Sequence, residues 1–128
     1  MSRLRRASEL DPADLATIQN VLASDPATWE LLEGAALRPD EAQHLMAEAP
    51  PGVTPDRKWL WVSEGIVMEM IEGYPDAETW YLGLIFVAPR VRGMGIGTQL
   101  LRWLEHTVKQ RGGTKLRLAV VVANTGAG

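Results

Sequence analysis

The chain has 128 residues, of which 46% are hydrophobic and 23% are charged, with five tryptophans and no cysteine. This length predicts one domain with a buried core, and the composition argues against an intrinsically disordered chain. The lack of cysteine excludes disulfides, thiolate metal sites and cysteine nucleophiles. No apolar run approaches the roughly 20 residues that span a bilayer, and no apolar segment follows the basic N-terminus. We therefore expect no membrane partner and a cytoplasmic location.

The formal net charge of −3 hides two parts of opposite sign. Residues 1–78 carry 15 acids and 6 bases, whereas residues 79–128 carry one acid, Glu105, and 7 bases. A basic segment of this kind suggests an anionic ligand, and an acidic surface either attracts cations or keeps the protein in solution. The two histidines are far apart in the sequence, and we predict no metal site.

The first part of the chain predicts a short strand over residues 2–8 and three helices after it. Two helices are expected to begin at Asp11 and Asp25, because each is followed by proline and an Asp-Pro pair supplies an N-cap and a first-turn residue. Pro39 gives the start signal for the third helix.

The pattern then changes to strands. Residues 58–63 and 66–71 are predicted to form a β-meander with the strand that follows. Residues 79–87 are nearly all apolar, which is typical of a central strand covered on both faces. A helix over about residues 96–111 and a second buried strand over residues 115–123 complete a strand-helix-strand unit with a right-handed parallel crossover. The sequence therefore predicts an α/β domain with helices on a mixed sheet.

The apolar face of the last helix is predicted to contain four side chains: Leu100, Leu101, Leu104 and Val108. A glycine-rich turn precedes this helix, and it places Arg92, Gly95 and Gly97 in an R-x-x-G-x-G spacing. The first N–H groups of a helix have no internal partner, and glycines let an anion approach them closely. The turn therefore predicts a phosphate site, the alternative being a glycine-rich turn without a ligand. Neither a Walker A loop nor the G-x-G-x-x-G dinucleotide fingerprint fits this spacing.

The segment from Val87 to Leu101, with the strand before it, resembles the acetyl-CoA-binding motif of the GCN5-related N-acetyltransferase (GNAT) superfamily. Asn124 and Ala127 resemble the N-x-x-A pattern that follows the next strand in that family. The resemblance implies a GNAT-like mixed sheet with helices on both faces, a central βαβ unit with an acetyl-CoA-binding turn, and C-terminal strands of the family missing from this chain. It divides the single domain into a substrate-side strand and helices, a β-meander, and a CoA-binding turn, helix and strand: residues 1–57, 58–87 and 88–128.

The resemblance also implies particular contacts with coenzyme A. Backbone groups of Ile85, Phe86 and Val87 would pair with the pantetheine arm, and Asn124 would contact the same arm. Arg92 would add positive charge beside the pyrophosphate. The pyrophosphate itself would be held by the amides of the turn: Gly93, Met94, Gly95, Ile96, Gly97 and Thr98.

The candidate catalytic residues lie near the start of the strand over residues 79–87, where the family places its general base. This neighbourhood offers Glu78 and Tyr81, and Glu69 and Glu72 are further carboxylates that can act through ordered water. The alternative to a catalytic role is that each of these carboxylates is simply a solvated side chain at the end of a strand. Many members have a tyrosine suited to protonating the leaving thiolate in a section that follows this segment, and because the sequence stops at Gly128 we expect no acid at that place.

The sequence thus predicts an enzyme that transfers an acetyl group from acetyl-CoA to a primary amine of a small molecule or peptide. The alternative is a non-catalytic acyl-CoA-binding or assembly module. No nucleic-acid motif is recognisable, and we expect no nucleic-acid partner. Because the strand over residues 115–123 lacks the strands that cover it in the family, we expect a homodimer or strand exchange through this edge. The alternative is that the 128 residues are a shortened version of a longer natural chain.

Overall fold

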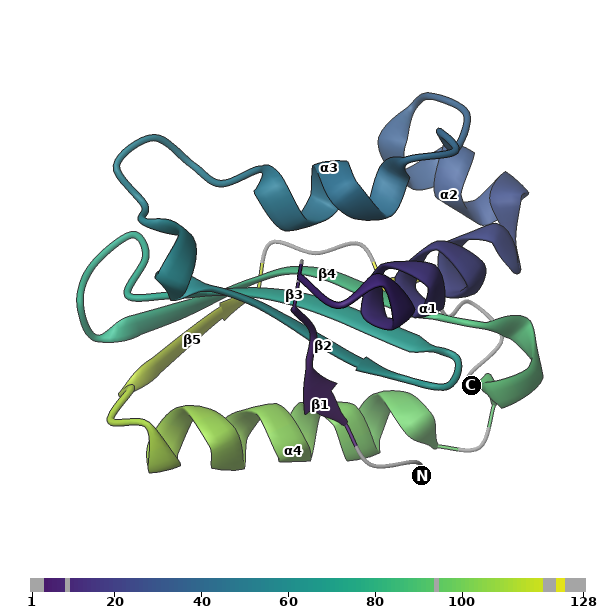
Figure 1. Ribbon diagram of the computed structural model, residues 1–128. Helices are drawn as coiled ribbons and strands as arrows, with labels where there is room; N and C mark the ends of the chain where they lie inside the picture. Colours follow the sequence, from purple (N-terminus) through teal and green to yellow (C-terminus); the bar gives the residue numbers. More distant parts are fainter. Residues whose placement is uncertain (1–3, 9, 94, 119–121, 124–128) are drawn as a thin grey trace.

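The computed structural model describes residues 4–8, 10–93, 95–118 and 122–123. It contains a mixed sheet between two helical layers (Figure 1). Helices α1, α2 and α3 cover one face of the sheet, and α4 covers the other. The predicted α/β class with helices on both faces is confirmed. The helices are α1 (Pro12–Ala23), α2 (Pro26–Glu33), α3 (Glu41–Ala47) and α4 (Ile96–Gln110), with short 3-10 turns η1 (Pro55–Arg57) and η2 (Pro89–Val91).

Two of these helices begin at the predicted aspartates. The Asp11 carboxylate accepts a hydrogen bond from the N–H of Ala13 at 2.9 Å, and the Asp25 carboxylate accepts one from the N–H of Thr28 at 3.2 Å. Each bond satisfies a donor that the helix itself leaves unpaired. The third helix starts after its predicted position, because its N-cap residue is Asp40.

The sheet has the order β1-β2-β3-β4-β5, and β6 pairs with a second part of β4. Neighbouring strands are antiparallel up to β4, while β5 and β6 both run parallel to β4. The connection from β4 through α4 to β5 is the predicted βαβ unit. The strands are β1 (Arg5–Arg6), β2 (Lys58–Ser63), β3 (Ile66–Glu72), β4 (Thr79–Val87), β5 (Lys115–Leu118) and β6 (Val122–Ala123).

The core consists of two apolar clusters, one on each face of the sheet. Trp80, Leu82 and Ile85 of β4 pack on the α4 side, whereas Leu84 and Phe86 pack on the side of α1 and α2. A strand that serves both clusters has apolar residues at nearly every position, which explains the unbroken apolar run in the sequence. The α4 side is completed by residues at every fourth position of that helix: Ile96, Leu100, Leu104 and Val108.

Two predictions of burial were wrong. Leu101 is 37% exposed, because neighbouring residues on a helix point about 100° apart and Leu100 already faces the core. The strand predicted over residues 115–123 is described as β5 and β6, and Leu118 in β5 is 51% exposed. Its burial was therefore predicted wrongly, whereas the expected edge position agrees with the structure, because among the described residues β5 pairs only with β4.

Gly112 and Gly113 follow α4, which ends within one residue of the predicted boundary. The N–H of Gly112 donates to the carbonyl of Lys109 at 3.1 Å, and the N–H of Gly113 donates to that of Val108 at 2.8 Å. These two bonds and the φ of +84° at Gly112 form a Schellman motif. A Cβ atom added at Gly113 would lie 2.6 Å from both Cδ1 of Trp80 and Cγ1 of Val108, so the backbone is packed directly against the core here.

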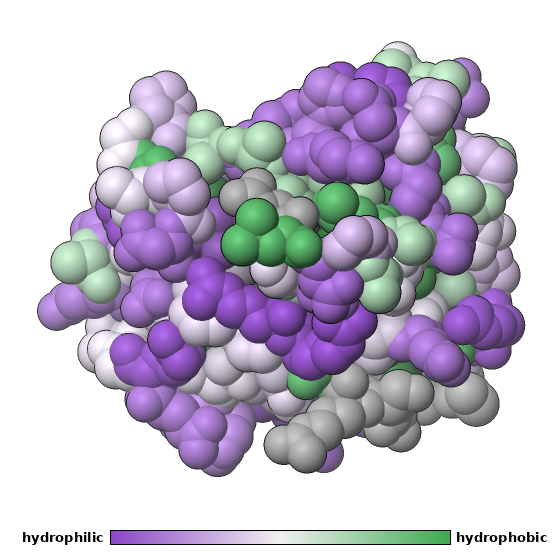
Figure 2. Space-filling model, in the orientation of Figure 1, coloured by the Kyte–Doolittle hydropathy of each residue, from purple (hydrophilic) through white to green (hydrophobic). Residues whose placement is uncertain are grey.

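Hydrophilic residues cover most of the surface seen in Figure 2, with a smaller apolar area near the middle of this view. Within the described ranges, the structure has no helix whose length and apolar character would let it cross a membrane.

Candidate active site

The glycine turn lies between the end of β4 at Val87 and the start of α4 at Ile96. Gly93 and Gly95 adopt φ angles of +85° and +68°, which side chains with a Cβ atom rarely tolerate. An added Cβ atom at either glycine would meet no described atom within 4 Å. These glycines therefore present an open backbone surface and are not required for close packing.

The N-terminus of α4 differs from those of α1 and α2. Its N-cap residue is Gly95, and within the described part of the chain no side chain caps it and no acidic residue lies in its first turn. The N–H of Gln99 donates to the carbonyl of Gly95 at 3.1 Å, which closes the first turn of the helix. The N–H groups of Ile96, Gly97 and Thr98 therefore have no intrahelical partner, and the helix dipole adds positive potential at the same place. This arrangement fits the predicted pyrophosphate site, and Met94 lies outside the described residues.

The two arginines of the turn have different surroundings. Arg90 is exposed, and it forms no ion pair among the described residues. Arg92 is mostly buried and has two protein partners. Its Nε donates to the carbonyl of Val87 at 2.8 Å, and its Nη1 lies 2.8 Å from a carboxylate oxygen of Asp25. The predicted contact of Arg92 with pyrophosphate therefore competes with these protein partners. Sequence reasoning missed Asp25, whose only signal was its role as a helix cap.

The backbone edge predicted to hold the pantetheine arm has a protein partner in this structure. Ile85 and Phe86 are in parallel register with Val122 and Ala123 of β6. This pairing is shifted by one residue from the register between β4 and β5, and Val87 lies just beyond it. A ligand that pairs with this edge must therefore displace β6 there. Asn124, the other predicted contact of the arm, lies outside the described residues.

A β-bulge interrupts the middle of β4. Glu69 pairs with Leu84 and the next residue of β3 pairs with Leu82, so that Gly83 is an extra residue on β4. Bulges leave the extra residue outside the regular hydrogen-bond ladder and are frequent at active sites. A Cβ atom added at Gly83 would lie 2.8 Å from Oε1 of Glu69 and 3.8 Å from Cε1 of Tyr81. The bulge thus brings a carboxylate and a phenol ring to one point on the sheet.

The Glu69 carboxylate is fixed by a mostly buried ion pair. Its Oε2 lies 3.0 Å from Nζ of Lys58, and the two side chains are 19% and 5% exposed. The same ammonium group donates to the backbone carbonyls of Leu45 and Glu48, which satisfies its other protons. Removing one member of such a pair leaves an uncompensated charge. The three contacts of the Lys58 ammonium group limit the positions that the Glu69 carboxylate can take.

The other predicted catalytic residues are more dispersed. Tyr81 is half-buried, and its ring packs edge-on against Tyr74 with the centroids 5.4 Å apart. Glu78 is exposed in the turn before β4, and at about 3.3 Å per residue the length of β4 puts it roughly 30 Å from the glycine turn. Glu72 accepts a hydrogen bond from Nε1 of Trp59 at 3.0 Å, and Trp59 belongs to the cluster on the α4 side. The structure therefore places Tyr81 near Glu69, whereas Glu78 and Glu72 lie away from this pair.

Negative charge surrounds Glu69 on the side of α2 and α3. Partial burial, and then the charges of Glu41, Glu69 and Glu48, raise the pKa of Glu33. Arg38 partly offsets this charge, and its hydrogen bonds lower the pKa of Glu41, to which it is paired at 2.6 Å. With four carboxylates against Arg38 and Lys58, this side attracts cations.

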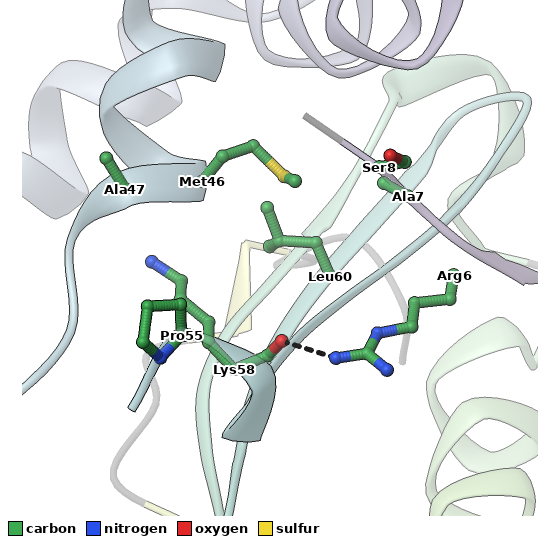
Figure 3. Close-up of a pocket in the computed structure, with 8 residues that line it drawn as sticks. All are labelled: Arg6, Ala7, Ser8, Met46, Ala47, Pro55, Lys58 and Leu60. Atoms are coloured by element: carbon green, nitrogen blue, oxygen red, sulfur yellow. Dashed lines mark hydrogen bonds between the residues drawn. The ribbon is translucent and has the colours of Figure 1, made fainter. Parts of the chain in front are cut away.

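A cavity of about 550 Å³ opens beside this acidic side (Figure 3). None of its lining residues belongs to the glycine turn, and Lys58 connects it to Glu69 through their ion pair. The Arg6 side chain at its edge is bound to the backbone carbonyls of Asp56 and Lys58. The lining residues are Arg6, Ala7, Ser8, Met46, Ala47, Pro55, Lys58 and Leu60.

A family model described as the acetyltransferase (GNAT) family matches residues 20–128, which include the sheet from β2 onward, the bulge and the glycine turn. The chain belongs to the GNAT family. The resemblance inferred from the sequence is thereby confirmed. No curated protein sequence matches this GNAT chain.

Solved structures share the fold of this GNAT chain at low sequence identity. An acetyltransferase from Thermus thermophilus has a TM-score of 0.67 and 23% identity over 92% of this chain and 77% of its own. A ribosomal-protein-alanine N-acetyltransferase from Brucella melitensis biovar Abortus 2308 has a TM-score of 0.63 and 20% identity over 93% of this chain and 82% of its own. An aminoglycoside acetyltransferase from an uncultured soil metagenomic sample, in complex with sisomicin, has a TM-score of 0.60 and 14% identity over 91% of this chain and 75% of its own. At these identities the likeness shows the fold.

Proposed function

We propose that this GNAT protein transfers an acetyl group from acetyl-CoA to a primary amine of a small molecule or peptide. The observation that carries the proposal is the uncapped N-terminus of α4 behind the open glycines Gly93 and Gly95. Coenzyme A has a pyrophosphate group, and this group matches backbone donors at a helix N-terminus. The family uses acetyl-CoA generally, and the open turn leaves room for it.

In this proposal the glycine turn binds the cofactor, and the residues beside the β-bulge act on the acceptor amine. Acetyl-CoA, when bound, supplies the acetyl group as a thioester. The amides from Gly95 to Thr98 hold the pyrophosphate, which fixes the position of the rest of the molecule. Glu69 would accept a proton from the acceptor ammonium through an ordered water, and Tyr81 lines the same place. The amide C–N bond would then form as the thioester C–S bond breaks, and the released thiolate would take up a proton from solvent. We favour Glu69 over Glu78 as the base because Glu69, on β3, lies beside the bulge in the middle of β4.

The charges around Glu69 support a cationic acceptor. An amine that arrives as an ammonium ion is attracted by the carboxylates of Glu33, Glu41 and Glu48 before it loses its proton. The names of two structural neighbours refer to a ribosomal-protein alanine and to aminoglycosides. Peptide N-termini and polyamino sugars therefore belong in the first panel of acceptors.

Binding of coenzyme A tests the turn. We expect the wild type to bind in a calorimetric titration, and Gly95→Asp to bind at least tenfold more weakly. A carboxylate about 5 Å from a phosphate charge repels it by roughly 1–3 kcal/mol, depending on the local dielectric constant. Gly95→Asn is the matched control, because asparagine has the same size and tolerates φ > 0 without the charge. Equal affinities of the two variants would refute the turn as the pyrophosphate site, and a wild type that does not bind would refute the proposed function.

Turnover tests the chemistry separately. We expect the wild type to acetylate at least one amine of the panel, and Glu69→Gln to lower kcat by about 10²–10³ because a general base is lost. The affinity for coenzyme A should stay unchanged in this variant, since Glu69 is not part of the turn. Binding without any turnover would instead support the non-catalytic acyl-CoA-binding module.

We also propose that two copies associate through β5. Leu118 is 51% exposed on this strand, and an exposed strand edge with apolar side chains readily pairs with another chain. Size-exclusion chromatography with light scattering should give the mass of a dimer, and Leu118→Lys should shift it to that of a monomer. A wild type that is monomeric at micromolar concentration would contradict this interface.

A further inference from the structure

The side chain of Arg92 connects three parts of the molecule. It follows η2 and precedes Gly93, so its backbone belongs to the glycine turn. Its guanidinium group is bonded to the carbonyl of Val87, the last residue of β4, and to the carboxylate of Asp25, which precedes α2. The side chains of Arg92 and Asp25 are only 16% and 18% exposed. The turn is therefore attached both to the end of β4 and to the helical layer on the acceptor side.

Asp25, which pairs with Arg92, is also the N-cap residue of α2. One oxygen of Asp25 accepts the N–H of Thr28, and the other accepts the hydroxyl of Thr28 at 2.6 Å and also faces Arg92. The hydrogen bond from the Thr28 hydroxyl, followed by the bond from Arg92, lowers the pKa of Asp25. A single carboxylate thus fixes the start of α2 and the base of the glycine turn.

A second contact holds α2 at the same end of β4. Trp29, in the first turn of α2, is 3% exposed, and its ring packs against that of Phe86 with the centroids 6.1 Å apart. Phe86 is next to Val87, whose carbonyl receives Arg92. Two separate contacts, the Asp25–Arg92 pair and the Trp29–Phe86 packing, therefore join the start of α2 to the end of β4.

The protein partners of Arg92 oppose a rotation of its guanidinium group toward a phosphate in the turn. Two of its three guanidinium nitrogens already have protein partners, and Nη2 is buried without a hydrogen-bond partner among the described residues. Turning the guanidinium group toward an anion in the turn would break a largely buried ion pair and leave Asp25 with less compensation. Arg90, which is exposed on η2, has no such constraint.

We propose that Arg92 is a positioning residue, and that the Asp25–Arg92 pair sets the shape of the glycine turn and couples its occupation to α2 on the acceptor side. This inference rests on the proposed function, because it assigns a role within the same coenzyme A site. The competing role is that of a direct pyrophosphate ligand, as the sequence motif suggests. The two roles predict opposite results when Asp25 loses its charge.

Asp25→Asn separates the two roles. Asparagine caps a helix about as well as aspartate, so α2 is kept while the ion pair is lost. A positioning role predicts about tenfold weaker binding of coenzyme A and a raised KM for the amine. A direct ligand predicts equal or tighter binding, because Arg92 is then free to meet the phosphate. Asp11→Asn is the matched control: Asp11 is the N-cap of α1 in the same Asp-Pro-Ala sequence, and within the described residues it pairs with no arginine. We expect it to bind coenzyme A like the wild type.

Arg92→Lys supplies the second measurement. Lysine keeps the charge but does not bridge Val87 and Asp25 with a planar fork. The positioning role predicts that this variant resembles Asp25→Asn and that the double variant binds no more weakly than either single one. Wild-type affinity in Arg92→Lys, unchanged affinity in Asp25→Asn, or losses that multiply in the double variant would each overturn the inference. A wild type that does not bind coenzyme A would overturn the proposed function, and this role with it. A wild type that binds, with variants that do not behave as described, would overturn only the role of Arg92.

Discussion

Replacing Gly83 with alanine tests whether the β-bulge of β4 serves chemistry or packing. The added Cβ atom would lie 2.8 Å from Oε1 of Glu69 and 3.8 Å from Cε1 of Tyr81. An ordinary contact requires the carboxylate oxygen to retreat by about half an ångström. Because Glu69 is also bound to Lys58 at 3.0 Å, this retreat disturbs the ion pair and moves the proposed base.

The expected effects on stability and activity differ. A shift of the Glu69 carboxylate by about half an ångström lengthens its pair with Lys58 without breaking it, and alanine also reduces the entropy of the unfolded chain. The free energy of unfolding should therefore change by about 1 kcal/mol or less. A displacement of about 1 Å in an active site can lower the rate a hundredfold, so a shift of half that size should lower kcat by roughly tenfold. The affinity for coenzyme A should remain that of the wild type, since the turn is untouched.

Gly113→Ala is the matched control, because it is the same substitution at another glycine whose added Cβ atom would lie under 3 Å from a neighbour. Here the atoms met at 2.6 Å belong to Trp80 and Val108 in the core, which have no room to yield. Overpacking of this kind costs about 1–3 kcal/mol, whereas kcat per folded molecule should be unchanged. Urea unfolding and initial-rate assays on both variants give the comparison. Full activity in Gly83→Ala, or a loss of stability equal to that of Gly113→Ala, would refute the reasoning.

Other variants test the core and the charges, each by urea unfolding. Leu104→Ala should cost about 2–5 kcal/mol because Leu104 is fully buried, whereas Leu101→Ala should cost less than about 1 kcal/mol. The pKa of Glu41 is lower in the folded state, so its contribution is present at neutral pH and is lost as pH falls through that value; Glu41→Gln should remove this part of the acid dependence. The pKa of Glu33 is raised, so Glu33→Gln should stabilise the fold at neutral pH, and its advantage should vanish in acid. A Glu33→Gln variant that is less stable than the wild type at pH 7 would contradict the proposed repulsion among these carboxylates.

The local signals in the sequence were sufficient for most elements. Asp11 and Asp25 marked two helix starts, because an Asp-Pro pair acts on its own neighbours and needs no tertiary partner. The apolar run of β4 predicted its central position, since each face of that strand meets a different helical layer. The family resemblance rested on a turn whose residues are contiguous, so it was visible without a structure.

Features that depend on distant residues were not predicted. The partner of Arg92 lies far away in the sequence at Asp25, and no pattern within the turn points to it. Glu69 was one of several possible carboxylates until the register between β3 and β4 placed it against Gly83. The only local signal for the bulge was a glycine inside an apolar strand, which is ambiguous by itself. The exposure of Leu118 likewise depends on which strands flank β5, and that is a property of the whole sheet.

The missing side-chain cap on α4 also determines how this protein should be handled at the bench. Backbone N–H groups that have no partner among the described residues can donate to small oxyanions as well as to a pyrophosphate group. If the proposed pyrophosphate site is correct, we expect phosphate or sulfate in a buffer to bind the turn. The melting temperature should then rise with the logarithm of the anion concentration, and the apparent affinity for coenzyme A should fall. Titrations in a buffer without multivalent anions, repeated with added sulfate, would measure the intrinsic strength of this helix end.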